Sequence, residues 1–272
     1  MLLSRVRPER ISSPIVSIAA VGLAILSSFG PRSRTRAMRF ARPLVRGTLV
    51  QRYNRFLADV MLEDGTAVTA HCANPGAMLG LNAPGTTVWL EAVDAPSRKL
   101  GHSWRLVELA GGGFAGIDAS LPNRLVAEAL AGGGVPALAG YATVRPEVRY
   151  GTRSRVDFLL TGPGRPDTWV EVKNVHLSRA PGLAEFPDSV TARGARHLGE
   201  LAAMVAAGHR AVMLYVVQRT DCTRFRLAPD LDPAYARAFA AAHAAGVETI
   251  AHGTRITPEG VWLDAALPVE SP

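Results

Sequence analysis

Two segments of the sequence decide the fold: RVDFLL at residues 155–160 and WVEVK at residues 169–173. Both are rich in apolar and β-branched residues, and residues 162–166 between them have the composition of a tight turn. We therefore predict two neighbouring strands, residues 153–160 and 168–175. Because side chains alternate along a strand, Glu171 and Lys173 face one side while Val170 and Val172 pack against the other.

Asp157, Glu171 and Lys173 form the candidate catalytic group. If Asp157 faces the same side as Glu171, the two carboxylates and the Val172 carbonyl offer hard oxygen ligands suited to Mg²⁺, or to Mn²⁺. Such a metal polarises a phosphodiester and acidifies a bound water, and Lys173 then orients that water or stabilises developing negative charge. An Asp followed by Glu-x-Lys has the spacing of a metal-dependent nuclease core. The alternative, an exposed strand face that carries Glu and Lys for solubility, stays open.

Lysine is scarce in this chain, which makes Lys173 informative. Of the 30 basic residues, 28 are arginine, and the other lysine is Lys99. The two cations are not interchangeable, since lysine is a compact charge with an adjustable pKa and arginine a rigid fork that stays charged. The retention of lysine at position 173 favours a chemical role over a purely structural one.

Two helices carry further candidates. Glu128, on a helix predicted from Pro122 to about residue 130, either supplies a third catalytic carboxylate or faces solvent. Arg193, Arg196 and His197 are spaced i, i+3 and i+4 and so share one face of a helix predicted at residues 191–207. They either line the cleft and contact phosphate or form a solvated face.

The first half of the chain has the pattern of a small barrel of the OB type. Asp64-Gly65 predicts a type I′ hairpin turn, in which both central residues take positive φ. In QRYNRF (51–56), Arg52, Tyr53 and Arg55 suit nucleic acid, since aromatic rings stack on bases and guanidinium groups hold phosphates. The alternative is that Tyr53 and Phe56 are core residues and the arginines face water. We expect Phe56 in the core, and the place of Tyr53 stays open. The predicted strands, frequent and short as in such barrels, are residues 44–51, 56–63, 67–72, 86–93, 104–110 and 114–117.

The second half changes to mixed strands and helices, which indicates an α/β domain. We place the domain boundaries at residues 38–119 for the barrel and 120–272 for the α/β part. Besides the elements already named, we predict strands at 144–150, 211–218, 247–251 and 261–263 and a helix at 233–245.

Composition limits the remaining choices. Cys72 and Cys222 have no paired spacing, so we expect reduced thiols and neither a disulfide framework nor a zinc site. The net charge is +7, of which residues 1–37 contribute +5 through six arginines and one glutamate. The basic character therefore says little about the body of the chain. The modest remaining charge of +2 argues against a large non-specific DNA footprint.

Residues 15–29 form an apolar run of 15 residues, shorter than the roughly 20 that a membrane span needs. We interpret residues 1–37 as a non-native or disordered extension, with translation starting at Met38 and no membrane association. The alternative is a secretory signal, because three arginines precede the run.

Several stretches together resemble the sugar fermentation stimulation protein family (SfsA) from Met38 onward. They are LVQRYNRFLADV (49–60), HCANPGAM (71–78), NRLVAEAL (123–130), RSRVDFLL (153–160), VEVKNVHL (170–177) and FPDSVTARGARHLGEL (186–201). The resemblance implies an OB-like barrel followed by a domain similar to PD-(D/E)xK nucleases. It also implies a cytoplasmic DNA-binding protein linked to regulation of sugar-utilisation genes. Asp157, Glu171 and Lys173 fall on the nuclease motif, and Glu128 lies on the preceding helix; Asn174 departs from the usual Ser or Thr.

Three functions follow as hypotheses, because a fold does not fix an activity. The preferred one is a DNA-binding regulator with a Mg²⁺-dependent phosphodiesterase site. The second is an active metal-dependent DNA or RNA nuclease. The third is a ligand-sensing module on an inactive nuclease fold. The sequence indicates neither the strandedness of the nucleic acid nor the oligomeric state.

Overall fold

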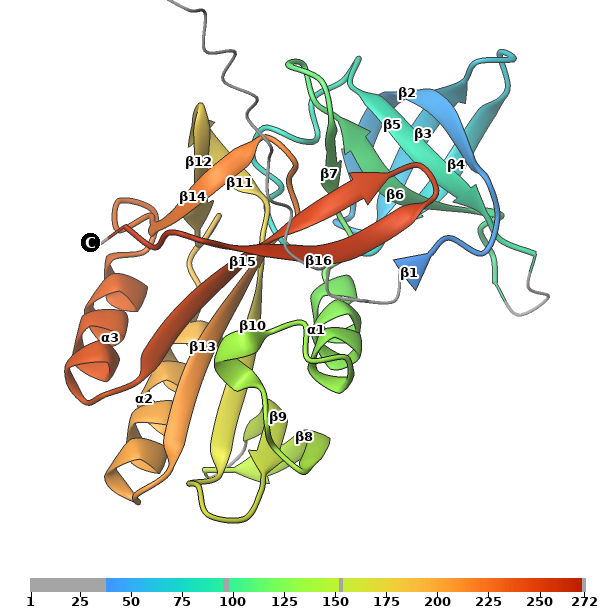
Figure 1. Cartoon of the computed structure of the whole chain (residues 1–272). Helices are drawn as coiled ribbons and strands as arrows, with labels where there is room; N and C mark the ends of the chain where they lie inside the picture. The colour runs from blue at the N-terminus through green and yellow to red at the C-terminus, as the bar shows by residue number, and fades with distance from the viewer. Residues whose placement is uncertain (1–37, 95–97, 152–153, 271–272) are drawn as a thin grey trace, which may run out of the picture. The chain divides into compact units, whose positions relative to one another are not determined.

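The computed structural model describes residues 38–94, 98–151 and 154–270. The interpretation of residues 1–37 as an extension therefore lies outside the described residues. Among the described helices, none is both long and apolar enough to cross a membrane. In Figure 1 β1 (Met38–Arg39) and the first barrel strands are blue and teal, the last barrel strands are green, and the elements that follow run from green to red.

The first half forms the expected barrel. Neighbouring strands pair antiparallel in the order β4-β3-β2-β5-β6, and a parallel pairing of β4 with β6 closes the ring. Large buried side chains such as Leu49, Leu90 and Trp104 fill the interior. Five strands closed in this order are typical of an OB fold. The strands are β2 (Leu44–Tyr53), β3 (Leu57–Leu62), β4 (Ala67–Cys72), β5 (Thr87–Ala92) and β6 (His102–Glu108), with β7 (Phe114–Gly116) paired to β6.

Two local predictions in the barrel were wrong. At the β3–β4 turn only Gly65 takes positive φ, and the Gly65 N–H donates to the Leu62 carbonyl (3.0 Å), so the turn is not type I′. Positive φ occurs instead at Asn54 and Arg55, in the β2–β3 connection. That tight connection turns Phe56 outward to 45% exposure, against the expectation of a core position.

A seven-stranded mixed sheet forms the second half, in the order β1-β16-β15-β13-β10-β9-β8. Strand β10 pairs antiparallel with β9 and parallel with β13, so it lies near the centre of the sheet. As Figure 1 shows, β15 and β16 form a long hairpin toward the barrel. The strands are β1 (Met38–Arg39), β8 (Thr143–Tyr150), β9 (Ser154–Thr161), β10 (Thr168–Val175), β13 (Arg210–Val217), β15 (Glu248–Thr257) and β16 (Gly260–Leu267).

Helices cover both faces of this sheet (Figure 1). Helix α1 (Leu121–Ala131) packs on one face with Val170 and Val172. Helices α2 (Ala192–Ala206) and α3 (Pro233–Ala244) pack on the other. The α2 and α3 N-termini are capped by Thr191 and Asp232, whose side chains accept from backbone N–H groups and so satisfy donors left free at a helix start.

A three-stranded sheet went unpredicted. It consists of β11 (Leu177–Ala180), β12 (Gly182–Phe186) and β14 (Cys222–Leu227), in the order β11-β12-β14. The buried Glu185 carboxylate, on β12, accepts hydrogen bonds from Arg179 (2.8 and 2.9 Å) and Arg226 (2.9 and 3.2 Å) and so ties the three strands together.

Replacing Glu185 with glutamine is expected to lower the free energy of unfolding at pH 7 by about 1.5–3 kcal/mol, the range for a hydrogen bond to a charged group. The Arg179 hydrogen bond, with Arg226, holds the Glu185 pKa below its usual value despite burial. A lowered pKa means that this stabilisation is present above the unfolded-state pKa and is lost as pH falls through the folded-state pKa.

Urea unfolding at pH 7 and at about pH 4 or below should therefore show the wild-type advantage shrinking in acid. Glu63→Gln, at an exposed ion pair with Arg46 in the barrel, serves as the control. An equal difference at both pH values would show that the Glu185 charge does not contribute.

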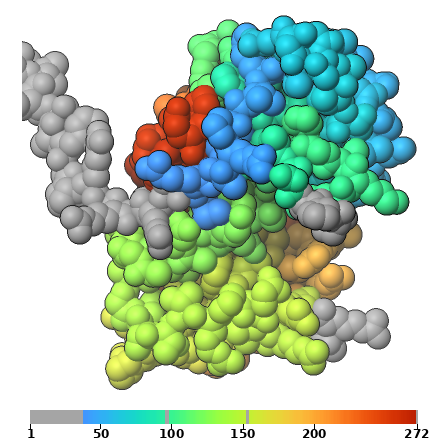
Figure 2. Space-filling view, turned by 90° about the vertical axis from the view of Figure 1, so that its right-hand side faces the viewer, coloured from blue at the N-terminus to red at the C-terminus, as the bar shows by residue number. Residues whose placement is uncertain are grey.

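Hydrogen bonds connect the barrel to the second half. Asp188 accepts from the Met78 N–H (3.1 Å), and Gln218 donates to the Asp118 carbonyl (3.0 Å). Strand β1 pairs with β16, and Figure 2 shows this blue segment lying against the red C-terminal hairpin. Asp188 also contacts His176 (3.2 Å), which directly follows β10, so the barrel loop 73–78 lies close to the end of that strand.

Candidate active site

Glu171 and Lys173 lie on the same side of β10, as the alternation predicts. The Lys173 Nζ donates to the Glu171 Oε1 at 2.6 Å, and both side chains are largely buried. His197 of α2 contacts the same oxygen through its Nδ1. Glu171 is therefore held on one oxygen by a lysine from its own strand and a histidine from the covering helix.

Asp157 lies beside Glu171 on the neighbouring strand. The β9–β10 ladder ends at the pair Val170↔Phe158, and the next position in that register sets Asp157 opposite Glu171. The Asp157 Oδ2 accepts from the Val172 N–H (2.7 Å), and its Oδ1 accepts from the Asn123 side chain on α1 (2.6 Å). The structure thus brings Asp157, Glu171 and Lys173 together where the two strands separate.

The pKa values of the two carboxyl groups are shifted in opposite directions. Burial and the charge of Glu171 raise the pKa of Asp157 to about 6. Burial also acts to raise the Glu171 pKa, but the hydrogen bonds from His197 and Lys173, together with the Lys173 charge, outweigh it and lower that pKa. Close carboxylates with pKa values pushed apart are typical of functional sites.

The residues present fit a divalent cation. Both Lys173 and His197 occupy the Glu171 Oε1, while Oε2 is buried without a hydrogen-bond partner among the described residues. An orphaned carboxylate oxygen is costly unless a cation or a water satisfies it. No group of three or more His, Cys, Asp or Glu with metal-binding geometry occurs in the described ranges. The carboxylates of Asp157 and Glu171 form a small ligand set, which suits Mg²⁺ because this ion usually keeps several waters.

In the part of the chain that the structure describes, no hydrogen bond or ion pair joins Glu128 to this cluster. On α1 it is Asn123 that reaches Asp157, and Glu128 lies about 140° around the helix axis from Asn123 at 100° per residue. The Glu128 Oε2 is buried and has no hydrogen-bond partner within the described ranges. A catalytic role for Glu128 stays a prediction.

The barrel candidates divide by their contacts. Arg52 donates to three backbone carbonyls, those of Arg55, Asn74 and Gly76, which fixes the loop 73–78. Tyr53 donates to Asp59 (3.2 Å), and Arg55 is exposed. Arg52 thus has a structural task, and nucleic-acid binding by these residues stays a prediction.

The α2 candidates share one face and line one groove, as their spacing predicts. The groove has a volume of about 430 Å³. Arg193 and Arg196 are exposed, whereas His197 is buried against Glu171. Contact with phosphate stays a prediction for all three. The groove is lined by Glu147, Ser154, Arg155, Arg193, Arg196 and His197.

Sequence reasoning missed Asn123, and it named His197 only as a candidate phosphate contact. Asn123 positions Asp157, and His197 contacts Glu171 rather than only facing the groove. Both contacts join α-helices to strands far away in the sequence, so no local spacing predicts them. Their presence in the stretches NRLVAEAL and ARGARHLGEL was the available signal.

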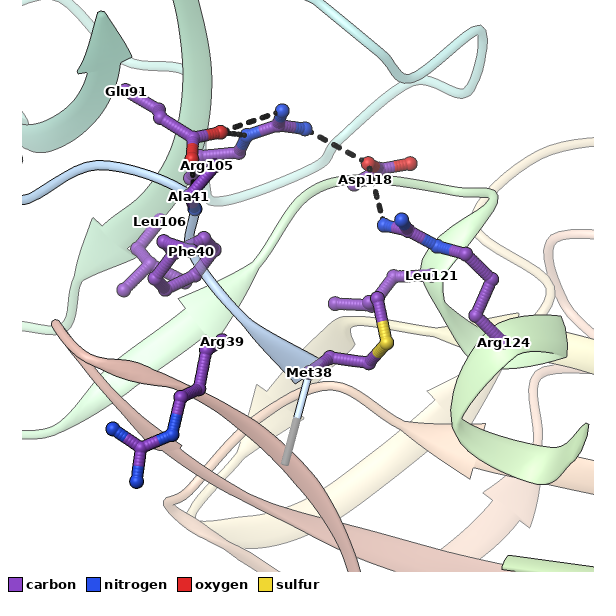
Figure 3. Close-up of a pocket in the computed structure, with 10 residues that line it drawn as sticks. All are labelled: Met38, Arg39, Phe40, Ala41, Glu91, Arg105, Leu106, Asp118, Leu121 and Arg124. Carbon is purple, nitrogen blue, oxygen red and sulfur yellow. Dashed lines mark hydrogen bonds and ion pairs between the residues drawn. The ribbon is translucent and has the colours of Figure 1, made fainter. Parts of the chain in front are cut away.

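A separate cavity of about 150 Å³ lies where β1, the barrel and α1 meet (Figure 3). Arg105 bridges Glu91 (2.8 Å) and Asp118 (3.0 Å) along its wall, and Glu91 also accepts from the Ala41 N–H (2.6 Å). Figure 3 shows Arg39 directed away from this row. Since the buried charges satisfy one another, this cavity is a structural junction.

The fold and the site together define the class of protein: an OB barrel followed by a restriction-endonuclease-like α/β domain. The family model "SfsA N-terminal OB domain" matches residues 50–117, and "Sugar fermentation stimulation protein RE domain" matches residues 120–260. The chain belongs to the SfsA family, which confirms the resemblance and the fold class.

The sequences of relatives align with nearly the whole described part of the chain. Proteins named "Sugar fermentation stimulation protein homolog" are 66% identical in Dinoroseobacter shibae and 64% identical in Jannaschia sp.. Each alignment covers 86% of this chain and 96% or 97% of the relative. A solved structure, "The structure of Pyrococcus Furiosus SfsA in complex with Ca2+", matches with a TM-score of 0.77 and 25% identity. That match covers 87% of this chain and all of the other.

Proposed function

We propose that this protein binds nucleic acid, with DNA as the expected ligand, and hydrolyses phosphodiesters at a divalent-metal site. The observation that carries the proposal is the buried Glu171 Oε2 beside Asp157 and Lys173, which has no hydrogen-bond partner among the described residues. A surface strand pair kept only for solubility would leave these charges in water, whereas here they are buried.

Each residue has a part in the proposed chemistry. Asp157 and Glu171 would hold Mg²⁺ or Mn²⁺, which supplies Lewis acidity and an acidified water when bound. Lys173 would stabilise the negative charge that develops on the phosphate. His197 and Asn123 orient the two carboxylates. The Pyrococcus furiosus relative in complex with Ca²⁺ supports a divalent cation, because Ca²⁺ and Mg²⁺ both prefer oxygen ligands.

The test uses the protein beginning at Met38 with labelled single- and double-stranded DNA, and with Mg²⁺, Mn²⁺ or EDTA. Cleavage that requires the metal supports the proposal. Absence of cleavage in every metal, with DNA still bound, would contradict the hydrolytic part.

A second candidate function is regulation of sugar-utilisation genes through DNA binding alone. The names of the relatives favour it, and an OB barrel is a common platform for oligonucleotides. Binding without cleavage, unchanged by substitutions at Glu171, would support this function. Binding of neither DNA nor RNA would favour a ligand-sensing module on a retired nuclease fold.

His197→Ala is expected to weaken divalent-metal binding about 10- to 100-fold, the usual cost of losing a partner that orients a metal ligand. Arg193 donates to His197 Nε2 (3.3 Å), so Nδ1 carries the proton that Glu171 accepts. Asparagine places an amide donor near the Nδ1 position, so His197→Asn should restore part of the affinity.

Isothermal titration calorimetry with Mn²⁺ or Ca²⁺ measures this affinity without any turnover. His243→Ala, at an exposed histidine on α3, is the matched control. Equal affinities for wild type and His197→Ala would contradict the orienting role.

A further inference from the structure

The β8–β9 hairpin carries two arginines in direct opposition. Arg149 of β8 and Arg155 of β9 are register partners in the antiparallel ladder, and both are exposed. Like charges at directly opposed positions destabilise a sheet. A sequence selected for stability alone would place a carboxylate or a neutral residue at one of the two positions.

Within the described residues, no carboxylate lies within ion-pair distance of either arginine, although Glu147 lines the adjoining groove. Across residues 38–94, 98–151 and 154–270, neither arginine forms an ion pair, whereas nine other arginines do. Arg193 and Arg196 of α2 likewise have no ion-pair partner there, and with Arg155 they line the groove described above. We call Arg149, Arg155, Arg193 and Arg196 the arginine surface.

The groove also contains a polar atom that lacks a partner. The Ser154 Oγ is buried, with the residue 7% exposed, and has no hydrogen-bond partner among the described residues. Ser154 lines the groove beside Arg155. A hydroxyl next to such guanidinium groups matches the donors that hold phosphate oxygens.

Backbone geometry marks the same place. Glu147 has φ of 53°, in the left-handed region that a non-glycine residue adopts at a cost. It lies between the register pairs Pro146↔Phe158 and Val148↔Val156 and therefore faces the Asp157 position on β9. The irregular backbone thus lies at the boundary between the groove and the candidate active site.

The groove continues into that site through one side chain. Arg193 donates to the His197 Nε2 (3.3 Å), and the other ring nitrogen of His197 contacts Glu171. A phosphate on the arginine surface would therefore lie close to the carboxylates. A nucleic-acid strand passing the site presents a phosphate at every nucleotide, which such a surface can hold.

We propose that the arginine surface binds phosphate groups of a nucleic-acid strand next to the candidate active site. The inference deepens the proposed function and rests on it for the choice of ligand. In this proposal, the hairpin β8–β9 and helix α2 contact the sugar-phosphate backbone of the nucleic acid, in addition to the contacts proposed for the barrel. The phosphate is either an internal phosphodiester or a terminal monoester, which share the oxygens that arginine recognises.

The test compares wild type with the double variant Arg149→Gln, Arg155→Gln in EDTA, where cleavage does not interfere. Fluorescence anisotropy measures binding of an oligodeoxynucleotide longer than the roughly 16 nucleotides that one OB fold covers at most. The probe carries a 5′-phosphate, a 3′-phosphate or neither, in single-stranded and duplex form. Arg237→Gln, at an exposed arginine on α3, is the matched control.

The double variant should bind about tenfold more weakly than wild type. In a plot of the logarithm of the binding constant against the logarithm of the salt concentration, the slope should be shallower by about one for each phosphate that the protein no longer neutralises. Arg237→Gln should match wild type. An equal loss for every probe identifies internal phosphodiesters, and a loss confined to one phosphorylated end identifies a terminal phosphate. Either result supports the inference.

Thermal melting separates this outcome from unfolding. Because the opposed arginines repel, the double variant should melt at the wild-type temperature or above it. Wild-type affinity and salt dependence in the double variant would overturn the inference, as would a wild type that binds no probe. Binding lost in the variant, together with no metal-dependent cleavage by wild type, would contradict the proposed hydrolysis and leave the arginine surface standing.

Discussion

Glu171→Gln and Lys173→Ala are each expected to lower the rate of metal-dependent cleavage by about 10³-fold, the upper range for losing one group that stabilises transition-state charge. Glutamine keeps the shape of Glu171 but removes the charge that a cation needs. Alanine at 173 removes the ammonium that lies 2.6 Å from Glu171. Single-turnover rates with saturating Mg²⁺ measure both effects.

Lys99→Ala is the matched control for Lys173, since Lys99 is the other lysine of the chain and is exposed. Mn²⁺ titration separates the two roles: Glu171→Gln should lose metal affinity, whereas Lys173→Ala should retain it. Full activity in Lys173→Ala would show that the lysine only pairs with Glu171 and has no part in the reaction.

Phe225→Ala is expected to lower the free energy of unfolding by about 3–5 kcal/mol, the usual cost of deleting a buried ring. Phe225 is fully buried and stacks on Tyr215 with ring centroids 4.4 Å apart. The ring attaches strand β14 to the central sheet. A loss of this size is a large part of the roughly 5–15 kcal/mol that stabilises a typical domain.

Phe56→Ala is the matched control, because Phe56 is 45% exposed, and surface substitutions usually change stability by less than about 0.5 kcal/mol. Guanidinium unfolding of both variants beside wild type gives the comparison. A similar small loss in both would show that β14 is not held by this packing.

The sequence predicted elements where hydrophobic periodicity is strong. Strand β10 spans Thr168–Val175 as expected, and α2 is one residue shorter at each end than predicted. Strands β15 and β16 run well beyond the predicted 247–251 and 261–263. Their outer parts carry polar residues and glycine, whose strand conformation depends on tertiary pairing.

In the candidate site, too, local sequence pattern predicted some features, whereas others depend on tertiary packing. Side-chain alternation along one strand predicted that Glu171 and Lys173 share a side, whereas the place of Asp157 depended on the register of the neighbouring strand, which the structure supplies. The contacts of Asn123 and His197 depend on how α1 and α2 pack on the sheet. Strands β11, β12 and β14 were missed because charged residues such as Arg179 and Glu185 mask their pattern and pair only after folding.

The pairing of β1 with β16 has a consequence for folding during synthesis. Met38 and Val261 are register partners although they are 223 positions apart in the chain. At typical translation rates of about 5–20 residues per second, the first strand is synthesised about 10–45 s before its partner. The barrel strands pair mainly with close neighbours in sequence and can assemble in that interval, while the central sheet must wait for the last residues of the chain.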